Sequence, residues 1–258
     1  MPDIPAPVGF TSLISSSWWL LRSLFGAMFR PMLAIVAVEW LALLLALVVA
    51  DADPAGMAAA FADLVRLMVR VTTSGLGVAL GAAIIADGVA GEPASARRAL
   101  RMCRPLLREL LAAALFGALL AMLFVFATQG LALLLMPLFF GPPLIVQVIA
   151  LEAKPFQLAT RRVREIGRGQ LARIFGYLLA VALFISLVVV VVPQVVAALG
   201  AGLGDAGQLG LWVLSSIVLS AIALAFFSAV TTVAYFDLRA RAENYGLEEL
   251  KADRGSTS

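Results

Sequence analysis

The chain has 258 residues, of which 62% are hydrophobic and 14% are charged, and its formal net charge is +3. Soluble domains have roughly 25% charged residues, so this composition excludes an ordinary water-soluble fold. One cysteine and no histidine leave no disulfide framework and no zinc site, and basic residues scattered between apolar runs argue against a nucleic-acid partner.

Long apolar runs predict a single all-α integral membrane domain, a bundle of about six transmembrane helices. Runs of about 19 residues or more can cross roughly 30 Å of hydrocarbon. The predicted spans are 31–50, 71–90, 110–128, 131–151, 174–199 and 209–236. Three amphipathic segments are predicted as interfacial helices at the membrane surface, namely 11–29, 94–108 and 155–170.

The first predicted span carries Glu39 near its middle. An ionisable group at this depth is costly, so Glu39 is a hypothesis for a proton or substrate site. Two alternatives stay open: a protonated carboxyl hydrogen-bonded to another helix, or an ion pair with an arginine that reaches inward.

The second predicted span has a row of small residues at four-residue spacing. Thr73, Gly77 and Gly81 share one helical face, and such a row lets a neighbouring helix backbone approach closely. Arg66 and Arg70 precede this span and are expected outside the membrane.

Two basic stripes precede the third and fifth predicted spans. Their members are Arg97, Arg101, Arg104 and Arg108 in the first segment and Arg161, Arg164 and Arg168 in the second. They are candidates for binding anionic lipid headgroups or an acidic partner, while the alternative is that they only hold their loops in the cytoplasm. Cys103 lies among them, as a reactive or lipid-modified thiol or, as we favour, as a packed and inert one.

The fourth predicted span contains Pro137 and the sequence Gly-Pro-Pro at 141–143, followed by Gln147. Prolines remove backbone donors and break a helix, and an interrupted helix can line a polar transport site. We favour a packing kink, because the other half of the chain shows no matching break.

The distribution of basic residues predicts that both termini are cytoplasmic. Segments 94–108, 152–173 and 237–258 are rich in arginine, whereas 129–130 and 200–208 contain none, and positive residues are retained on the cytoplasmic side. Asp237 and Arg241 are one turn apart and are predicted to pair at the interface.

Two stretches resemble a known family. Leu151-Glu152 followed by Ala159, Arg161 and Gly169, and the later run from Tyr235 through Asp237 to Arg241, are similar to the six-helix membrane domain that is fused to some bacterial glycerophosphodiester phosphodiesterases and also stands alone. The resemblance implies a multi-pass protein of the bacterial inner membrane. It implies no reaction, because the catalytic barrel of those enzymes is absent here.

The sequence favours a non-enzymatic accessory, scaffold or regulator that has no cofactor and that contacts the bilayer and other membrane proteins. The alternative is a transporter or lipid-handling protein that uses Glu39 and the broken fourth helix, and a membrane enzyme is the weakest interpretation. A continuous polar cavity that reaches Glu39 favours transport, whereas a tightly packed bundle favours the scaffold.

Overall fold

The computed structural model describes residues 9–52, 57–126 and 143–255, and these contain no β-strand, which confirms the all-α prediction. The long helices are α1 (Phe10–Ala52), α2 (Met57–Ala90), α7 (Leu171–Leu199) and α8 (Gly204–Glu243). The shorter elements are α3 (Ala96–Cys103), the 3₁₀ turn η1 (Arg104–Leu106), α4 (Leu107–Phe126), α6 (Phe156–Ile166), the 3₁₀ turn η2 (Ala201–Leu203) and α9 (Leu247–Gly255). A further apolar helical segment covers Pro143–Glu152.

Four helices in the described part of the chain are long and apolar enough to cross a membrane, so the protein is a helical membrane protein. These candidate spans are Phe10–Ala46, Leu64–Ala90, Ala172–Leu199 and Gly204–Glu243, and they correspond to the first, second, fifth and sixth predicted spans. The third, 110–128, coincides with α4, which is described to Phe126 but is not among the four. Most of the fourth, 131–151, lies outside the described residues, so a six-span bundle stays a prediction.

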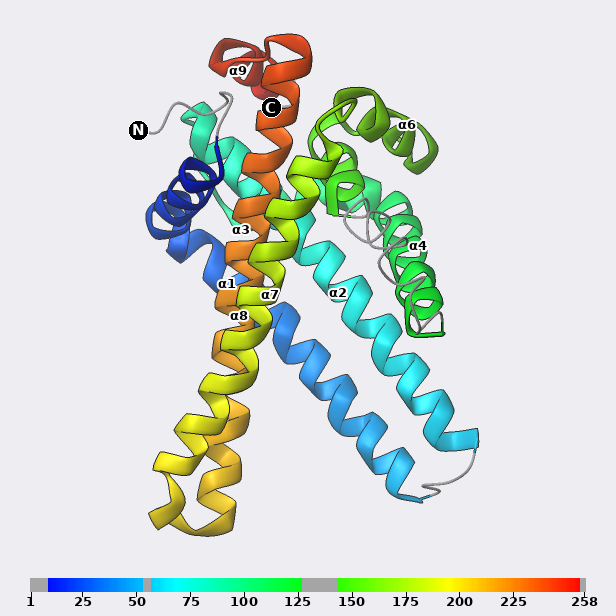
Figure 1. Cartoon of the computed structure of the whole chain (residues 1–258), viewed down its shortest axis with the longest axis vertical. Coiled ribbons are helices and arrows are strands. Elements are labelled where there is room, and N and C mark those ends of the chain that lie inside the picture. The colour runs from blue at the N-terminus through cyan, green and yellow to red at the C-terminus, as the bar shows by residue number, and fades with distance from the viewer. Residues whose placement is uncertain (1–8, 53–56, 127–142, 256–258) are drawn as a thin grey trace.

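The structure joins the predicted interfacial helix 11–29 and the first span in one helix, α1, which continues through Pro31. A proline inside a helix removes one backbone hydrogen bond and commonly bends the helix. In Figure 1 the first turns of α1 run at an angle to its later part. The two predicted elements are therefore two arms of one bent helix.

Helix α8 is the centre of the bundle and packs against α1, α2 and α7. The core lies toward the end of the molecule where Figure 1 places α3, α6 and α9. There, every residue of Ser228–Leu238, Val78–Asp87 and Leu144–Ala150 is buried. Toward the opposite end, the pair α1–α2 and the pair α7–α8 diverge from each other (Figure 1).

The predicted small-residue row lies where α2 meets α8. A Cβ atom added to Gly81 would lie 2.0 Å from Ser228 Oγ, and one added to Gly77 would lie 2.6 Å from a Leu224 methyl carbon. The Ser228 hydroxyl donates a hydrogen bond to the Val78 carbonyl of α2 at 3.2 Å. The two helices thus approach at a distance that only glycine permits on the α2 side.

Candidate functional site

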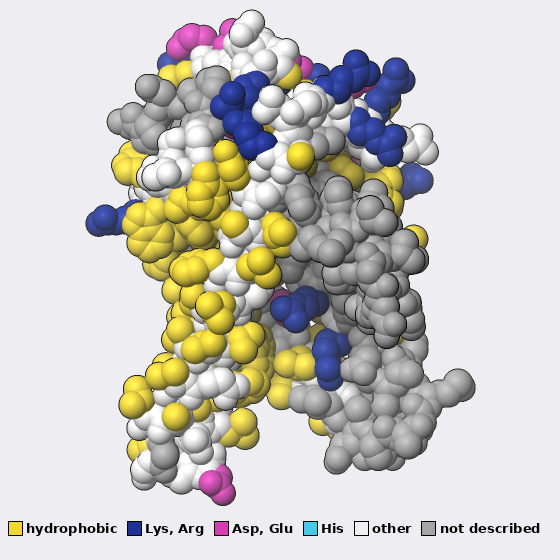
Figure 2. All heavy atoms as spheres, in the orientation of Figure 1, with side chains coloured by type: hydrophobic (Ala, Val, Ile, Leu, Met, Phe, Trp, Pro, Cys, Tyr) yellow, Lys and Arg dark blue, Asp and Glu magenta, His cyan; other side chains and the backbone are white. Residues whose placement is uncertain are grey.

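A polar groove opens where the two helix pairs begin to diverge. One pocket of about 290 Å³ and a neighbouring one of about 240 Å³ share Glu39, Arg70 and Ser220 in their walls. Figure 2 shows basic side chains inside a hollow at this level of the molecule. The polar residues of the two walls, which define the polar groove from here on, are Glu39, Arg66, Arg70, Ser74, Ser186, Gln194, Ser216 and Ser220.

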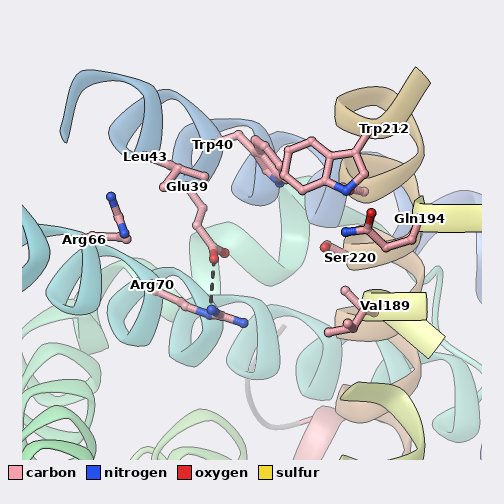
Figure 3. A pocket seen from close by; sticks show the side chains of 11 residues that line it. Glu39, Trp40, Leu43, Arg66, Arg70, Val189, Gln194, Trp212 and Ser220 are labelled. Atoms are coloured by element: carbon pink, nitrogen blue, oxygen red, sulfur yellow. Dashed lines mark ion pairs between the residues drawn. The ribbon is translucent and has the colours of Figure 1, made fainter. Parts of the chain in front are cut away.

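Glu39 of α1 pairs with Arg70 of α2 inside this groove. The distance from Glu39 Oε1 to Arg70 Nε is 3.4 Å, and Figure 3 shows the carboxylate pointing from α1 toward the guanidinium. Of the two alternatives that the sequence left open for Glu39, the structure shows the ion pair with an arginine. The sequence did not identify Arg70 as the partner, because the two residues are far apart in the chain and meet only through the α1–α2 contact.

Arg70 lies inside a candidate span and not before it. The apolar stretch of α2 begins at Leu64, earlier than the predicted start at residue 71, and so takes in both Arg66 and Arg70. The Arg70 side chain is 71% exposed with respect to the described residues, against 26% for Glu39. A guanidinium in contact with hydrocarbon is costly, so an exposed Arg70 within a membrane span requires water or a polar group beside it.

The wall opposite the ion pair supplies neutral polar groups. Gln194 of α7 and Ser220 of α8 face Glu39 across the groove in Figure 3. Trp40 and Trp212 close one side, with ring centroids 5.6 Å apart in an edge-to-face arrangement. The groove thus combines one ion pair, hydroxyl and amide groups, and apolar surface such as Val189, which is the composition of a site that binds and orients a ligand.

Gln147, the other predicted intramembrane polar residue, lies in the core and not in the walls of the groove. Its side-chain nitrogen donates to Thr231 Oγ1 at 2.9 Å, and its oxygen accepts from Thr232 Oγ1 at 3.3 Å. Both ends of a fully buried amide are therefore satisfied, which accords with a packing role. The predicted break at 137–142 lies outside the described residues.

Asp87, which the sequence analysis did not single out, is a fully buried acid near the end of α2. Its two carboxylate oxygens lie 3.6 Å from Arg98 of α3 and 3.8 Å from Arg254 of α9. The residues before Asp87 are mostly apolar, so hydropathy averaged over this run does not reveal the acid. The signal that was available is the acid itself, since a carboxylate in a buried helix needs a cation from elsewhere in the chain.

Glu152 is the centre of an ionic cluster at the end of the bundle. It accepts a hydrogen bond from the Tyr235 hydroxyl at 2.6 Å and contacts Lys154 at 2.7 Å and Arg162 at 3.1 Å. Burial opposes its ionisation, but the hydrogen bonds from Lys154 and Tyr235 and the charges of Arg162 and Arg239 outweigh burial and lower the pKa of Glu152. The hydrogen bond between Tyr235 and Glu152 joins the two stretches that carry the family resemblance.

Asp237 joins α7 to α8 in the same region. It accepts a hydrogen bond from Arg241 Nε at 2.8 Å, which confirms the predicted pair, and another from Arg173 of α7 at 2.6 Å. The second partner was not predicted, because it depends on how α7 packs against α8.

The predicted basic stripes lie on the surface. All seven members are exposed, namely Arg97, Arg101, Arg104, Arg108, Arg161, Arg164 and Arg168. The spacing of the first stripe assumes one continuous α-helix, whereas the structure inserts the 3₁₀ turn η1 between α3 and α4. Arg98 and Arg162, which lie beside stripe members in sequence, instead turn inward to pair with buried or half-buried acids.

Cys103 is buried on the inner side of α3. Burial raises the pKa of its thiol to about 11 although the charge of Arg254 acts in the opposite direction. The packed and inert alternative therefore fits this environment better than a reactive thiol, which needs exposure and a lowered pKa.

Among the described residues, no group of three or more cysteine, aspartate or glutamate side chains could hold a metal ion. Comparisons of the chain with protein-family models, with curated proteins and with solved structures found no match. The family resemblance therefore stays a prediction, and a function has to be argued from the polar groove and the charged surface.

Proposed function

We propose that the protein is a multi-pass inner-membrane protein that binds an amphiphilic molecule in the polar groove and transports it or presents it within the bilayer. The observation that carries this proposal is the Glu39–Arg70 pair in the wall of an open pocket. A tightly packed bundle with no pocket at Glu39 would have favoured a scaffold. The presence of the groove favours the transport or lipid-handling alternative over the scaffold.

An amphiphile suits the size and shape of the groove. Pockets of about 290 Å³ and 240 Å³ are at or below the small end of ligand sites, so they accommodate a headgroup and not a whole lipid. The walls of both pockets also contain apolar side chains of α7, such as Val189 and Val190, so an apolar tail attached to that headgroup has apolar surface to pack against.

The distribution of charge supports the proposed orientation with both termini in the cytoplasm. Figure 1 places the two ends of the described chain at the same end of the bundle as α6 and α9. Figure 2 shows most of the visible lysine and arginine side chains gathered there, together with acidic ones, whereas the opposite tip shows an acidic side chain and no basic one. This asymmetry follows the rule that positive loops are retained inside.

A second candidate function is that of an accessory or scaffold protein. It is favoured by the exposure of all seven stripe arginines, each of which is available to an anionic headgroup or to an acidic partner. Near an anionic surface, each such side chain contributes about 1 kcal/mol. The two functions are compatible, and the proposed role is non-enzymatic in both.

Native mass spectrometry of the gently solubilised protein tests the proposal, with Arg70→Gln as the test variant. Arg30→Gln is the matched control, because Arg30 is an exposed arginine of α1 that is not in the groove wall. We expect a lipid or solute that is retained by the wild type and by Arg30→Gln and is lost from Arg70→Gln. Equal retention by all three proteins would overturn the groove as the binding site. A stoichiometric protein partner with no groove ligand would support the scaffold instead.

A further inference from the structure

The Glu39–Arg70 pair leaves most of the arginine available. Glu39 contacts the guanidinium at Nε, at 3.4 Å, and the Arg70 side chain remains 71% exposed. Glu39 is the only carboxylate that pairs with Arg70 among the described residues. A guanidinium offers five donors, and a tetrahedral or planar anion can engage two of them at once.

The groups that face this pair define its chemistry. Helix α1 contributes Glu39, and α2 contributes Arg66, Arg70 and the neutral Ser74. Helices α7 and α8 contribute only neutral polar groups to the walls, namely Ser186, Gln194, Ser216 and Ser220. Arginine stays protonated in proteins, so among the wall residues of the groove Glu39 is the one whose side chain can take up a proton.

We propose that an anionic headgroup binds Arg70 in place of the Glu39 carboxylate, and that Glu39 takes up one proton as the anion binds. This inference rests on the proposed function and names its ligand class and its coupling. A cationic ligand is disfavoured, because the exposed guanidinium of Arg70 would repel it.

The charges balance in this exchange. Before binding, the pair consists of a carboxylate and a guanidinium. After binding, it consists of a neutral carboxylic acid and a guanidinium bound to the ligand anion, and the proton comes from the acid form of the buffer in the surrounding solution. The net charge of the groove is unchanged, which matters because an uncompensated charge in surroundings of low dielectric constant is costly. A carboxylate that loses its only cation, with an anion nearby, is neutralised most easily by protonation.

The test uses the full chain in phosphatidylcholine nanodiscs and decanesulfonate as the probe. A sulfonate does not titrate near neutral pH, so any proton taken up belongs to the protein. Isothermal titration in two buffers of different ionisation enthalpy gives the number of protons bound per ligand. We expect about one proton for the wild type and none for Glu39→Gln, with affinity falling about tenfold per pH unit for the wild type once Glu39 is ionised, and unchanged for the variant.

Control variants separate coupling from folding. Glu39→Asp keeps a carboxylate and should keep the proton uptake, Arg70→Gln should lose binding, and Arg30→Gln should behave like the wild type. A parallel titration with sodium sulfate distinguishes the source of the anion. Binding of decanesulfonate alone indicates a membrane-embedded headgroup, and binding of both probes indicates a free anion, so either result supports an anion site.

The possible failures are distinguishable. Arg70-dependent binding without proton uptake overturns the coupling and leaves the groove as a binding site. A groove that retains a native ligand in mass spectrometry but does not bind sulfonate overturns the anionic class. If the groove neither retains a native ligand in mass spectrometry nor binds decanesulfonate, the proposed function is overturned as well.

Discussion

Arg254 of α9 places a guanidinium nitrogen 3.8 Å from Asp87 of α2, and their side chains are only 4% and 0% exposed. The contact joins the last described helix to the buried end of the second one. Asp87 accepts no hydrogen bond from the described residues, and Arg98 at 3.6 Å is its second cation. The carboxylate therefore depends on two arginines from outside its own helix.

Replacing Arg254 with alanine should loosen α9 and destabilise the bundle. Removal of one partner of a buried ion pair leaves the other charge without full compensation and costs on the order of 3 kcal/mol. We expect a lower midpoint of thermal unfolding in detergent and faster proteolysis within 247–255. Lys251→Ala is the control, because Lys251 and its partner Glu248 are both well exposed, and equal behaviour of the two variants would contradict the role of Arg254.

Acidification should destabilise the protein through Glu152. The pKa of Glu152 is lowered below its ordinary value of 4.5, so its contribution is complete above that value and is lost as the pH falls through the lower, folded-state pKa. Glu152→Gln should flatten this acid limb when the unfolding midpoint is measured between pH 3 and 7. Glu165→Gln, which removes an exposed i,i+4 pair with Arg161, should leave the limb in place.

Cys103 should resist modification in the folded protein. A buried thiol whose pKa is about 11 has about 100-fold less thiolate at pH 7.5 than a free cysteine, and thiolate is the reactive form. Maleimide labelling should be slow until a denaturant is added. Leu100→Cys in a Cys103→Ala background is the control, because Leu100 is 57% exposed and its thiol should react at once.

Adding a methyl group at Gly81 should separate α2 from α8. The new Cβ would lie 2.7 Å from the Ser228 Cβ and 2.0 Å from its hydroxyl oxygen, so Gly81→Ala should lower the unfolding midpoint by several degrees. Gly176→Ala is the matched control, because nothing lies within 4 Å of the corresponding position in α7. A Gly81→Ala protein as stable as the control would contradict the close helix contact.

The features that the sequence predicted correctly are those that depend on local pattern. Apolar runs locate α1, α2, α7 and α8, and one-turn spacing predicts the Asp237–Arg241 pair. The features that the sequence did not predict depend on packing between helices. The partners of Glu39 and Asp87 come from other helices, and no periodicity within one helix specifies them. Averaged hydropathy also gives Asp87 little weight, although its buried carboxylate requires cations from other helices.

The position of α8 at the centre has a consequence for synthesis. The ribosome completes α1 and α2 roughly a hundred residues before it begins α8, which is about 10 s at ordinary translation rates. During that interval, the Gly77–Gly81 face of α2, which packs against α8 in the finished bundle, lacks its final partner. A chain that terminates before α8 is therefore left with an unfilled helix surface in the bilayer, which makes it a substrate for membrane chaperones and proteases.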